Sequence, residues 1–216
     1  MDRLIKSVDV KVLKYSIEDK PRVFVCGGGS PVLKEYYEDA YNIGQLLAKL
    51  GVAYVQGGLS DRKTMMGESY HGYKDAGGES AYFISRKFGT EDILEDIKDL
   101  KGVCEVKDIA DLLRAQYLWS DIVIMTPGGT GTLIEMLSYI EQKYDYPEQQ
   151  PTVIIFNKQV NGKGFFDSFF EQIKNSQVVG FVSHPVIEEN FIVVDNLEEL
   201  REELIKILEN EKIKKI

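Results

Sequence analysis

The sequence has few of the residues that bring metal ions or disulfides to a protein. Its 216 residues include two cysteines and two histidines. Cys26 and Cys104 each fall within an expected strand, and their spacing is not that of metal ligands. His71 and His184 are far apart in the chain and do not form a metal-binding pattern. We therefore expect free thiols in a reducing compartment, which predicts a cytoplasmic protein. We expect no bound metal and no other cofactor.

Long apolar runs are also missing. No stretch approaches the ~18 consecutive apolar residues that a membrane-spanning helix needs. The segment Met1–Lys20 has no long apolar core of the kind found in signal peptides. We expect neither a membrane span nor a secretion signal.

Basic residues are fewer than acidic residues. Lysine and arginine number 26 against 35 aspartates and glutamates, which gives a net charge of −9. Such a chain is a poor partner for a nucleic-acid backbone or an anionic membrane. An anionic small ligand must therefore be held by local backbone donors and a few basic side chains.

The sequence is rich in short apolar strands that alternate with amphipathic helices. Its length and its 44% hydrophobic residues fit one globular domain. Strands are expected at 23–26, 52–55, 80–84, 103–106, 121–125, 152–156 and 191–194. Helices are expected at 33–50, from 65 to the Gly77-Gly78 pair, at 108–119, 133–143, 165–174 and 197–213. This order predicts an α/β fold, a doubly wound and mostly parallel sheet with helices on both faces.

The two ends of this pattern and one internal segment are less regular. Residues 1–20 alternate loosely and predict an N-terminal arm or edge strand, while 21–216 are expected to form a single domain. The polar segment 86–102 has apolar residues at helical spacing and is expected to be a surface helix or lid.

The stretch Thr126–Glu135 is the strongest functional signal, because it joins a buried strand to a helix. Three glycines in four positions let a ligand approach the main chain closely, and a threonine can cap the helix, either Thr130 or Thr132. The first turn of that helix offers unpaired N–H groups and the positive end of the dipole, which suit a phosphate. The expected ligand contacts in this stretch are Gly128, Gly129, Thr130, Gly131 and Thr132.

Glu135 lies just inside the same turn. A carboxylate there suits the helix but repels a phosphate, so we expect it to face a neutral or cationic part of the same ligand. The alternative is that the glycines form only a tight turn and that Glu135 is a surface residue matched to the helix dipole.

Two further glycine clusters follow other strands, at Gly27–Gly29 and Gly57-Gly58. In an open parallel sheet, ligands bind outside the carboxyl ends of the strands, where the strand order reverses. Three glycine-rich loops at one edge favour a ligand the size of a nucleotide. None of them has the pattern of a P-loop or of a dinucleotide-binding loop, so nucleoside triphosphate hydrolysis and a dinucleotide cofactor are disfavoured.

These loops resemble those of a known family. The residues from Pro127 to Glu135 match the P-G-G-x-G-T-x-x-E signature of the Lonely-Guy type phosphoribohydrolases, often labelled lysine-decarboxylase-like. Supporting similarities lie at Cys26-Gly27-Gly28, at Gly57-Gly58 with Met66-Gly67, and at Gly180-Phe181-Val182-Ser183. The resemblance covers about residues 21 to 210. It implies a Rossmann-like nucleotide-binding domain and, commonly in this family, a homodimer.

The resemblance also implies an activity, which is hydrolysis of the N-glycosidic bond of a nucleoside 5′-monophosphate to a free base and ribose 5-phosphate. The implied ligand contacts outside the central motif are Gly27, Gly28, Gly57, Gly58 and Met66. Glycoside cleavage passes through an oxocarbenium-like transition state, which the carboxylate of Glu135 could stabilise. The lysine-decarboxylase label would instead require a pyridoxal-phosphate lysine, and the spacing selects none.

Two departures from the family pattern bear on catalysis. The loop after Gly58 is about two residues longer than in the family and carries Asp61, Arg62 and Lys63. The family arginine on the helix before the central strand falls, when counted back from Asp121, on Leu112. The nearest base is Arg114, which is about 200° around the helix from that position.

We therefore keep two hypotheses for the arginine. Arg114 could orient the ligand or assist the leaving base if the helix is shifted, or it could form a surface ion pair with Asp111 or Asp108. If no basic side chain reaches the pocket beside Glu135, a non-catalytic nucleotide sensor or carrier becomes the better interpretation.

Overall fold

A computed structural model describes residues 10–15, 18–30, 32–58, 61–85, 100–146, 150–180 and 186–214. The strands of the main sheet are β1 (Val10–Tyr15), β2 (Arg22–Cys26), β3 (Ala53–Gln56), β4 (Ala81–Ser85), β5 (Gly102–Val106), β6 (Ile122–Met125), β7 (Thr152–Phe156) and β10 (Ile192–Val194). The helices are α2 (Lys34–Lys49), α3 (Met65–Asp75), α5 (Ile109–Trp119), α6 (Thr130–Asp145), α7 (Asp167–Val178), α8 (Val186–Asn190) and α9 (Leu197–Lys214).

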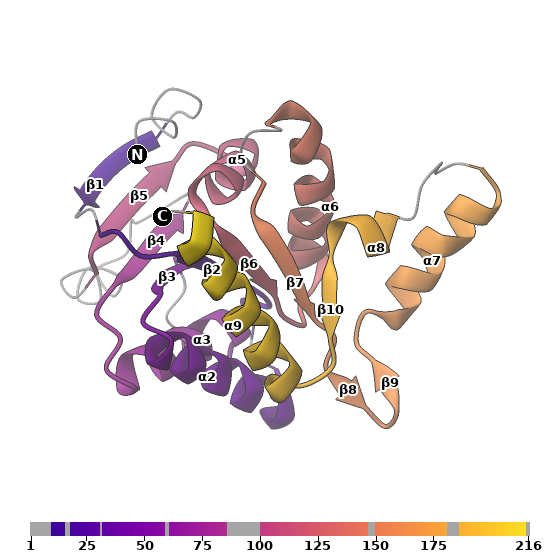
Figure 1. Cartoon of the computed structure of the whole chain (residues 1–216), viewed down its shortest axis with the longest axis horizontal. Coiled ribbons are helices and arrows are strands. Elements are labelled where there is room, and N and C mark those ends of the chain that lie inside the picture. Colours follow the sequence, from indigo (N-terminus) through magenta and orange to yellow (C-terminus); the bar gives the residue numbers. More distant parts are fainter. Residues whose placement is uncertain are drawn as a thin grey trace.

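The eight strands form one sheet in the order β1-β5-β4-β3-β2-β6-β7-β10 (Figure 1). All neighbours from β5 to β10 pair in parallel, and β1 adds an antiparallel strand at one edge. This arrangement confirms the doubly wound α/β fold expected from the sequence. Within residues 1–20, for which an N-terminal arm or edge strand was expected, the structure describes β1 at the edge of the sheet.

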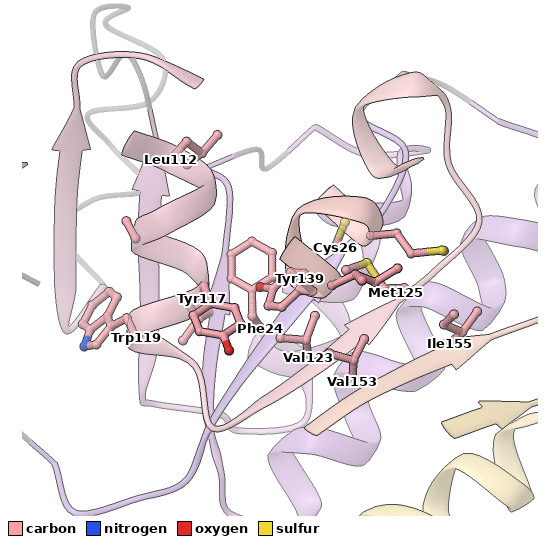
Figure 2. Packing of buried hydrophobic residues seen from close by; sticks show 14 of the residues in the cluster. Phe24, Cys26, Leu112, Tyr117, Trp119, Val123, Met125, Tyr139, Val153 and Ile155 are labelled. Carbon is pink, nitrogen blue, oxygen red and sulfur yellow. The ribbon is translucent and has the colours of Figure 1, made fainter. Parts of the chain in front are cut away.

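Helices cover both faces of the sheet because its buried strands are apolar on both sides. Along β2, Val23 and Val25 pack in one cluster with residues of α2, α3 and α9, whereas Phe24 and Cys26 pack in the other with residues of α5 and α6. Figure 2 shows Tyr117 of α5 and Tyr139 of α6 within this second cluster. The alternation of β2 therefore points Cys26 toward α5 and α6.

Three local features differ from the expectation. A hairpin of β8 (Gln159–Val160) and β9 (Lys163–Gly164) was not expected, although Asn161-Gly162 is a typical hairpin turn and both residues have positive φ. The short helix α8 was not expected either, and the helix predicted at 165–174 runs from Asp167 to Val178. Most of the segment 86–102, expected to be a helix or lid, lies outside the described residues.

Two other observations concern predictions made from the sequence. Cys26 and Cys104 are free and buried, as expected. Among the helices that the structure describes, none has both the length and the hydrophobicity needed to cross a bilayer.

The helices α2 and α3 approach each other closely through two glycines. A Cβ atom at Gly44 of α2 would lie 1.9 Å from the Ser69 carbonyl oxygen, and one at Gly72 of α3 would lie 1.9 Å from the Tyr41 carbonyl oxygen. This contact fixes the start of α3, and therefore the loop before it, against the body of the fold.

We predict that Gly44→Ala lowers the free energy of unfolding by about 1–3 kcal/mol, because the added methyl group forces the two helix backbones apart. Asn42→Ala, at an exposed position of the same helix, is the matched control and is expected to keep or slightly raise stability through helix propensity. Chemical denaturation measures both. Equal stability of Gly44→Ala and the wild type would contradict the close contact.

Candidate functional site

The strand order reverses between β2 and β6. From β2 the chain proceeds through β3 and β4 to β5 on one side, then returns to β6 on the other side of β2 and continues to β7 and β10. Ligands of open α/β sheets bind at such a reversal, outside the carboxyl ends of the strands. The loops that begin at Gly27 and Thr126 follow these two strands.

A pocket of about 1440 Å³ opens at this position. Of the residues predicted to bind ligand, its lining includes Gly27, Gly28, Gly57, Met66, Gly128, Gly129, Thr130, Gly131, Thr132 and Glu135. Gly58, which is buried with a φ of +86°, and Arg114 are not among the lining residues. The structure therefore brings most of the expected residues together around one cavity.

The loops around the pocket are joined through their main chains. The Gly28 N–H donates to the Pro127 carbonyl oxygen at 3.1 Å, and the Met65 N–H donates to the Gly28 carbonyl oxygen at 3.0 Å. A Cβ atom at Gly27 would lie 2.0 Å from Thr126 Oγ1, whose hydroxyl donates to the Cys26 carbonyl oxygen at 2.9 Å. Only glycine allows this approach of the two loops.

The helix α6 begins with open N–H groups in this pocket. Its N-cap is Gly129, and no side chain of the described residues caps it. The expectation that Thr130 or Thr132 caps the helix is wrong, because the helix begins at Thr130 itself. The Thr132 side chain is instead buried in the turn, where a Cβ atom at Gly128 would lie 2.0 Å from its Oγ1. Since Gly129 carries no side-chain acceptor, the first N–H groups of α6 face the pocket without a capping oxygen.

Glu135 reaches the pocket from one turn further along α6 and is already hydrogen-bonded. Cys26 Sγ donates to Glu135 Oε2, and Gln116 Nε2 donates to Glu135 Oε1 at 3.0 Å. Burial raises the pKa of the Glu135 carboxyl above its ordinary value, and the two hydrogen bonds offset only part of this effect. Burial and the negative charge of Glu135 together raise the pKa of the Cys26 thiol well above its usual range. The pair therefore favours a neutral thiol beneath the carboxyl group.

Neither partner of Glu135 was identified from the sequence. Gln116 lies four residues after Leu112, so the two share a face of α5, and this spacing was a signal for its position. Leu112 is 8% exposed and lines the pocket at the place where the family arginine was expected. On this face of α5, Leu112 therefore lines the pocket and the Gln116 amide contacts Glu135.

Two arginines considered for the site form ion pairs with acidic side chains. Arg114 Nη1 lies 3.6 Å from Asp111 Oδ1, which is the surface pair kept as an alternative above. Arg62 of the inserted loop pairs with Glu68 at 3.1 Å, and the Lys63 N–H donates to the same carboxylate at 2.9 Å. Among the described lining residues, Lys107 is the one basic side chain, and it is exposed.

One of the two histidines, His71, lies within the described residues. His71 lies on α3 with its ring centroid 5.5 Å from that of Tyr70, and His184 lies outside the described residues. Within the described ranges, no group of three or more histidine, cysteine, aspartate or glutamate side chains could hold a metal ion.

Comparison with solved structures shows the same fold in two proteins. One is the molybdenum cofactor binding protein of Rippkaea orientalis, which matches with a TM-score of 0.60 and 20% identity over 90% of this chain and 98% of that chain. The other is the Moco carrier protein of Chlamydomonas rheinhardtii, which matches with a TM-score of 0.59 and 17% identity over 88% of this chain and 99% of that chain. Identities this low show the fold alone.

Two comparisons of sequence concern the family. An uncharacterized protein of Archaeoglobus fulgidus is 27% identical over 127 residues, which are 59% of this chain and 79% of that protein. The family model described as "Possible lysine decarboxylase" matches residues 58–204, more than half of the chain. The chain therefore belongs to the family described as possible lysine decarboxylases, the Lonely-Guy-like family that its central motif resembles.

Proposed function

We propose that this protein binds a small phosphorylated ligand in the pocket between β2 and β6 and acts as a carrier or sensor of that ligand. The ligand is a nucleoside 5′-monophosphate or a related organic phosphate. The observation that carries the proposal is the glycine-capped N-terminus of α6, whose first N–H groups face the pocket. Such N–H groups, aligned with the helix dipole, hold a phosphate without needing a basic side chain.

The two structurally similar proteins support a carrier role. One is described as a molybdenum cofactor binding protein and the other as a Moco carrier protein. A carrier of a small molecule needs a pocket that holds its ligand, and the pocket between β2 and β6 could serve that role here.

Three features of the pocket support binding without turnover. Leu112 occupies the position of the family arginine, and Arg114 pairs with Asp111. Both carboxyl oxygens of Glu135 already accept a hydrogen bond, from Cys26 and from Gln116, so the group is engaged by the protein before any ligand binds. A carrier must leave its ligand intact, so its function does not require the family arginine.

Hydrolysis of the N-glycosidic bond is the second candidate. It is favoured by the position of Glu135, which lies one turn from the expected phosphate site, and by the full P-G-G-x-G-T-x-x-E match. In this case the Glu135 carboxylate would stabilise the developing oxocarbenium ion. The catalytic role expected for Arg114 stays a prediction that requires α5 to shift.

The first test concerns the phosphate. Gly131 is exposed, lines the pocket and has no atom within 4 Å of an added Cβ, so the fold accepts a side chain there. We predict that Gly131→Asp keeps or raises stability, because an acidic residue in the first turn suits the helix. The same substitution should weaken binding of a nucleoside 5′-monophosphate by at least about tenfold through charge repulsion.

Gly131→Asn is the matched control, because it has nearly the same size and no charge. Titration calorimetry with the tightest-binding member of a nucleoside 5′-monophosphate panel measures all three proteins. Equal affinities of the aspartate and asparagine variants would contradict the placement of the phosphate.

The second test separates carrier from hydrolase. We predict that the wild type binds a nucleoside 5′-monophosphate without releasing base or ribose 5-phosphate, as followed by chromatography. Release of base would favour the hydrolase. In that case Glu135→Gln should lower turnover by about 10²–10³ while leaving binding nearly intact.

Arg114→Ala serves as the control variant in the same assay. We expect it to change neither binding nor turnover, since exposed ion pairs contribute little. A large effect of Arg114→Ala would show instead that α5 shifts and brings this side chain into the pocket.

We also propose a homodimer. Leu137 is exposed on α6, at 41%, and lies outside the pocket lining, so a second copy could cover it. Light scattering should then report about twice the chain mass of 24.5 kDa, and a monomer at micromolar concentration would contradict the proposal.

A further inference from the structure

The pocket exposes an unusual share of apolar surface. The structure shows eight exposed large hydrophobic side chains among its described residues, and four of them line this one pocket. These four are Leu33, Ile109, Ile134 and Phe165. Apolar groups left open to water in a concave site indicate that part of the ligand is itself apolar or flat.

Tyr36 and Phe165 are the two aromatic residues of the described lining. Their ring centroids lie 5.9 Å apart at an interplanar angle of 76°, which is an edge-to-face contact. Phe165 is 42% exposed, so a large part of its ring is not covered by Tyr36 or the rest of the protein. The pair therefore offers an aromatic surface to the pocket.

This aromatic pair and the expected phosphate site come from different layers of the fold. Tyr36 belongs to the first turn of α2, and α2 packs on the same face of the sheet as α3 and α9. The open N–H groups belong to α6, which packs on the other face with α5. A ligand that reaches both must extend across the edge of the sheet, and about 1440 Å³ gives it room to do so.

The segment that carries Phe165 is held firmly in place. The Phe165 N–H donates to the Lys158 carbonyl oxygen at 3.1 Å, and the Lys158 ammonium group pairs with Asp39 of α2. These two contacts tie the β8–β9 hairpin to the helix that carries Tyr36. The aromatic pair is therefore positioned before any ligand arrives, which lowers the entropy cost of binding.

The residues on either side of Phe165 are fixed as well. Asn157 donates through Nδ2 to Asp167 Oδ1 at 2.8 Å and accepts from the Phe166 N–H at 2.8 Å. The Gly164 N–H donates to Asp167 Oδ2 at 2.8 Å, and a Cβ atom at Gly164 would lie 2.1 Å from Asn157 Nδ2. This network leaves the backbone at Phe165 little freedom while its side chain stays open to the pocket.

We propose that the exposed ring of Phe165, held edge-to-face by Tyr36, is a platform that stacks on a planar heteroaromatic ring of the ligand. The inference rests on the proposed function, because it concerns the other end of the same phosphorylated molecule. Lys158 and Asp39 beside the platform form an ion pair with each other, so we expect the ring to be recognised by its flat face rather than by a charge on this pair. Stacking on aromatic side chains tolerates any ring with such a face. Phosphorylated ligands with a planar ring such as a nucleobase are therefore selected over sugar phosphates.

The test compares two ligands that differ in the ring. Titration calorimetry measures a nucleoside 5′-monophosphate and ribose 5-phosphate on the wild type and on Phe165→Ala. We expect the wild type to bind the nucleotide more tightly than the sugar phosphate. We expect Phe165→Ala to weaken nucleotide binding by about 10- to 100-fold, the usual range for the loss of one stacking side chain, and to leave ribose 5-phosphate unchanged.

Two variants control this result. Phe165→Tyr keeps the ring and should bind as the wild type does, whereas Val178→Ala removes an exposed apolar side chain outside the pocket lining and should have no effect. Thermal unfolding of each variant reports whether the hairpin stays folded.

The outcomes separate this inference from the proposed function. If Phe165→Ala binds both ligands with wild-type affinity, the stacking proposal is wrong and the phosphate-binding proposal is unaffected. The same holds if Phe165→Ala loses affinity for both ligands by the same factor while Phe165→Tyr keeps wild-type affinity. If the wild type binds neither ligand, the proposed function fails and the inference fails with it.

Discussion

The site depends on the backbone contact between the loops that follow β2 and β6. At Gly27 a Cβ atom would lie 2.0 Å from Thr126 Oγ1, and the Gly28 N–H donates to the Pro127 carbonyl oxygen. This contact places the first turn of α6 at the reversal of strand order, beside the pocket. A larger residue at Gly27 would separate the loops and displace the N–H groups to which we assign the proposed anion binding.

The same geometry determines what chemistry the pocket can perform. Because side chains alternate along β2, Cys26 points toward α6 and donates to Glu135. The helix α5 contributes Gln116 to the same carboxyl group and Leu112 to the pocket wall. The Glu135 carboxyl group is therefore held by two neutral hydrogen-bond donors, an arrangement that we take as support for the proposed carrier role.

Much of the fold and the backbone part of the site could be predicted from the sequence. Glycines at strand ends indicate where the main chain must turn sharply or approach another loop, and Leu112, the position found by counting back from Asp121, lines the pocket. The partners of Glu135 were missed because they depend on how α5 is rotated against α6, which spacing alone does not fix. Phe165 was missed because its position depends on a hairpin whose Asn161-Gly162 turn was overlooked.

A crystal structure of the protein with a bound nucleoside 5′-monophosphate tests the central claim most directly. The account predicts phosphate oxygens within hydrogen-bonding distance, about 2.7–3.2 Å, of the backbone nitrogens in the first turn of α6, at residues 130–132. It also predicts that Gly128 and Gly129 keep the main-chain positions described here. A nucleotide whose phosphate lies elsewhere in the pocket, with the first turn of α6 empty, would contradict the account.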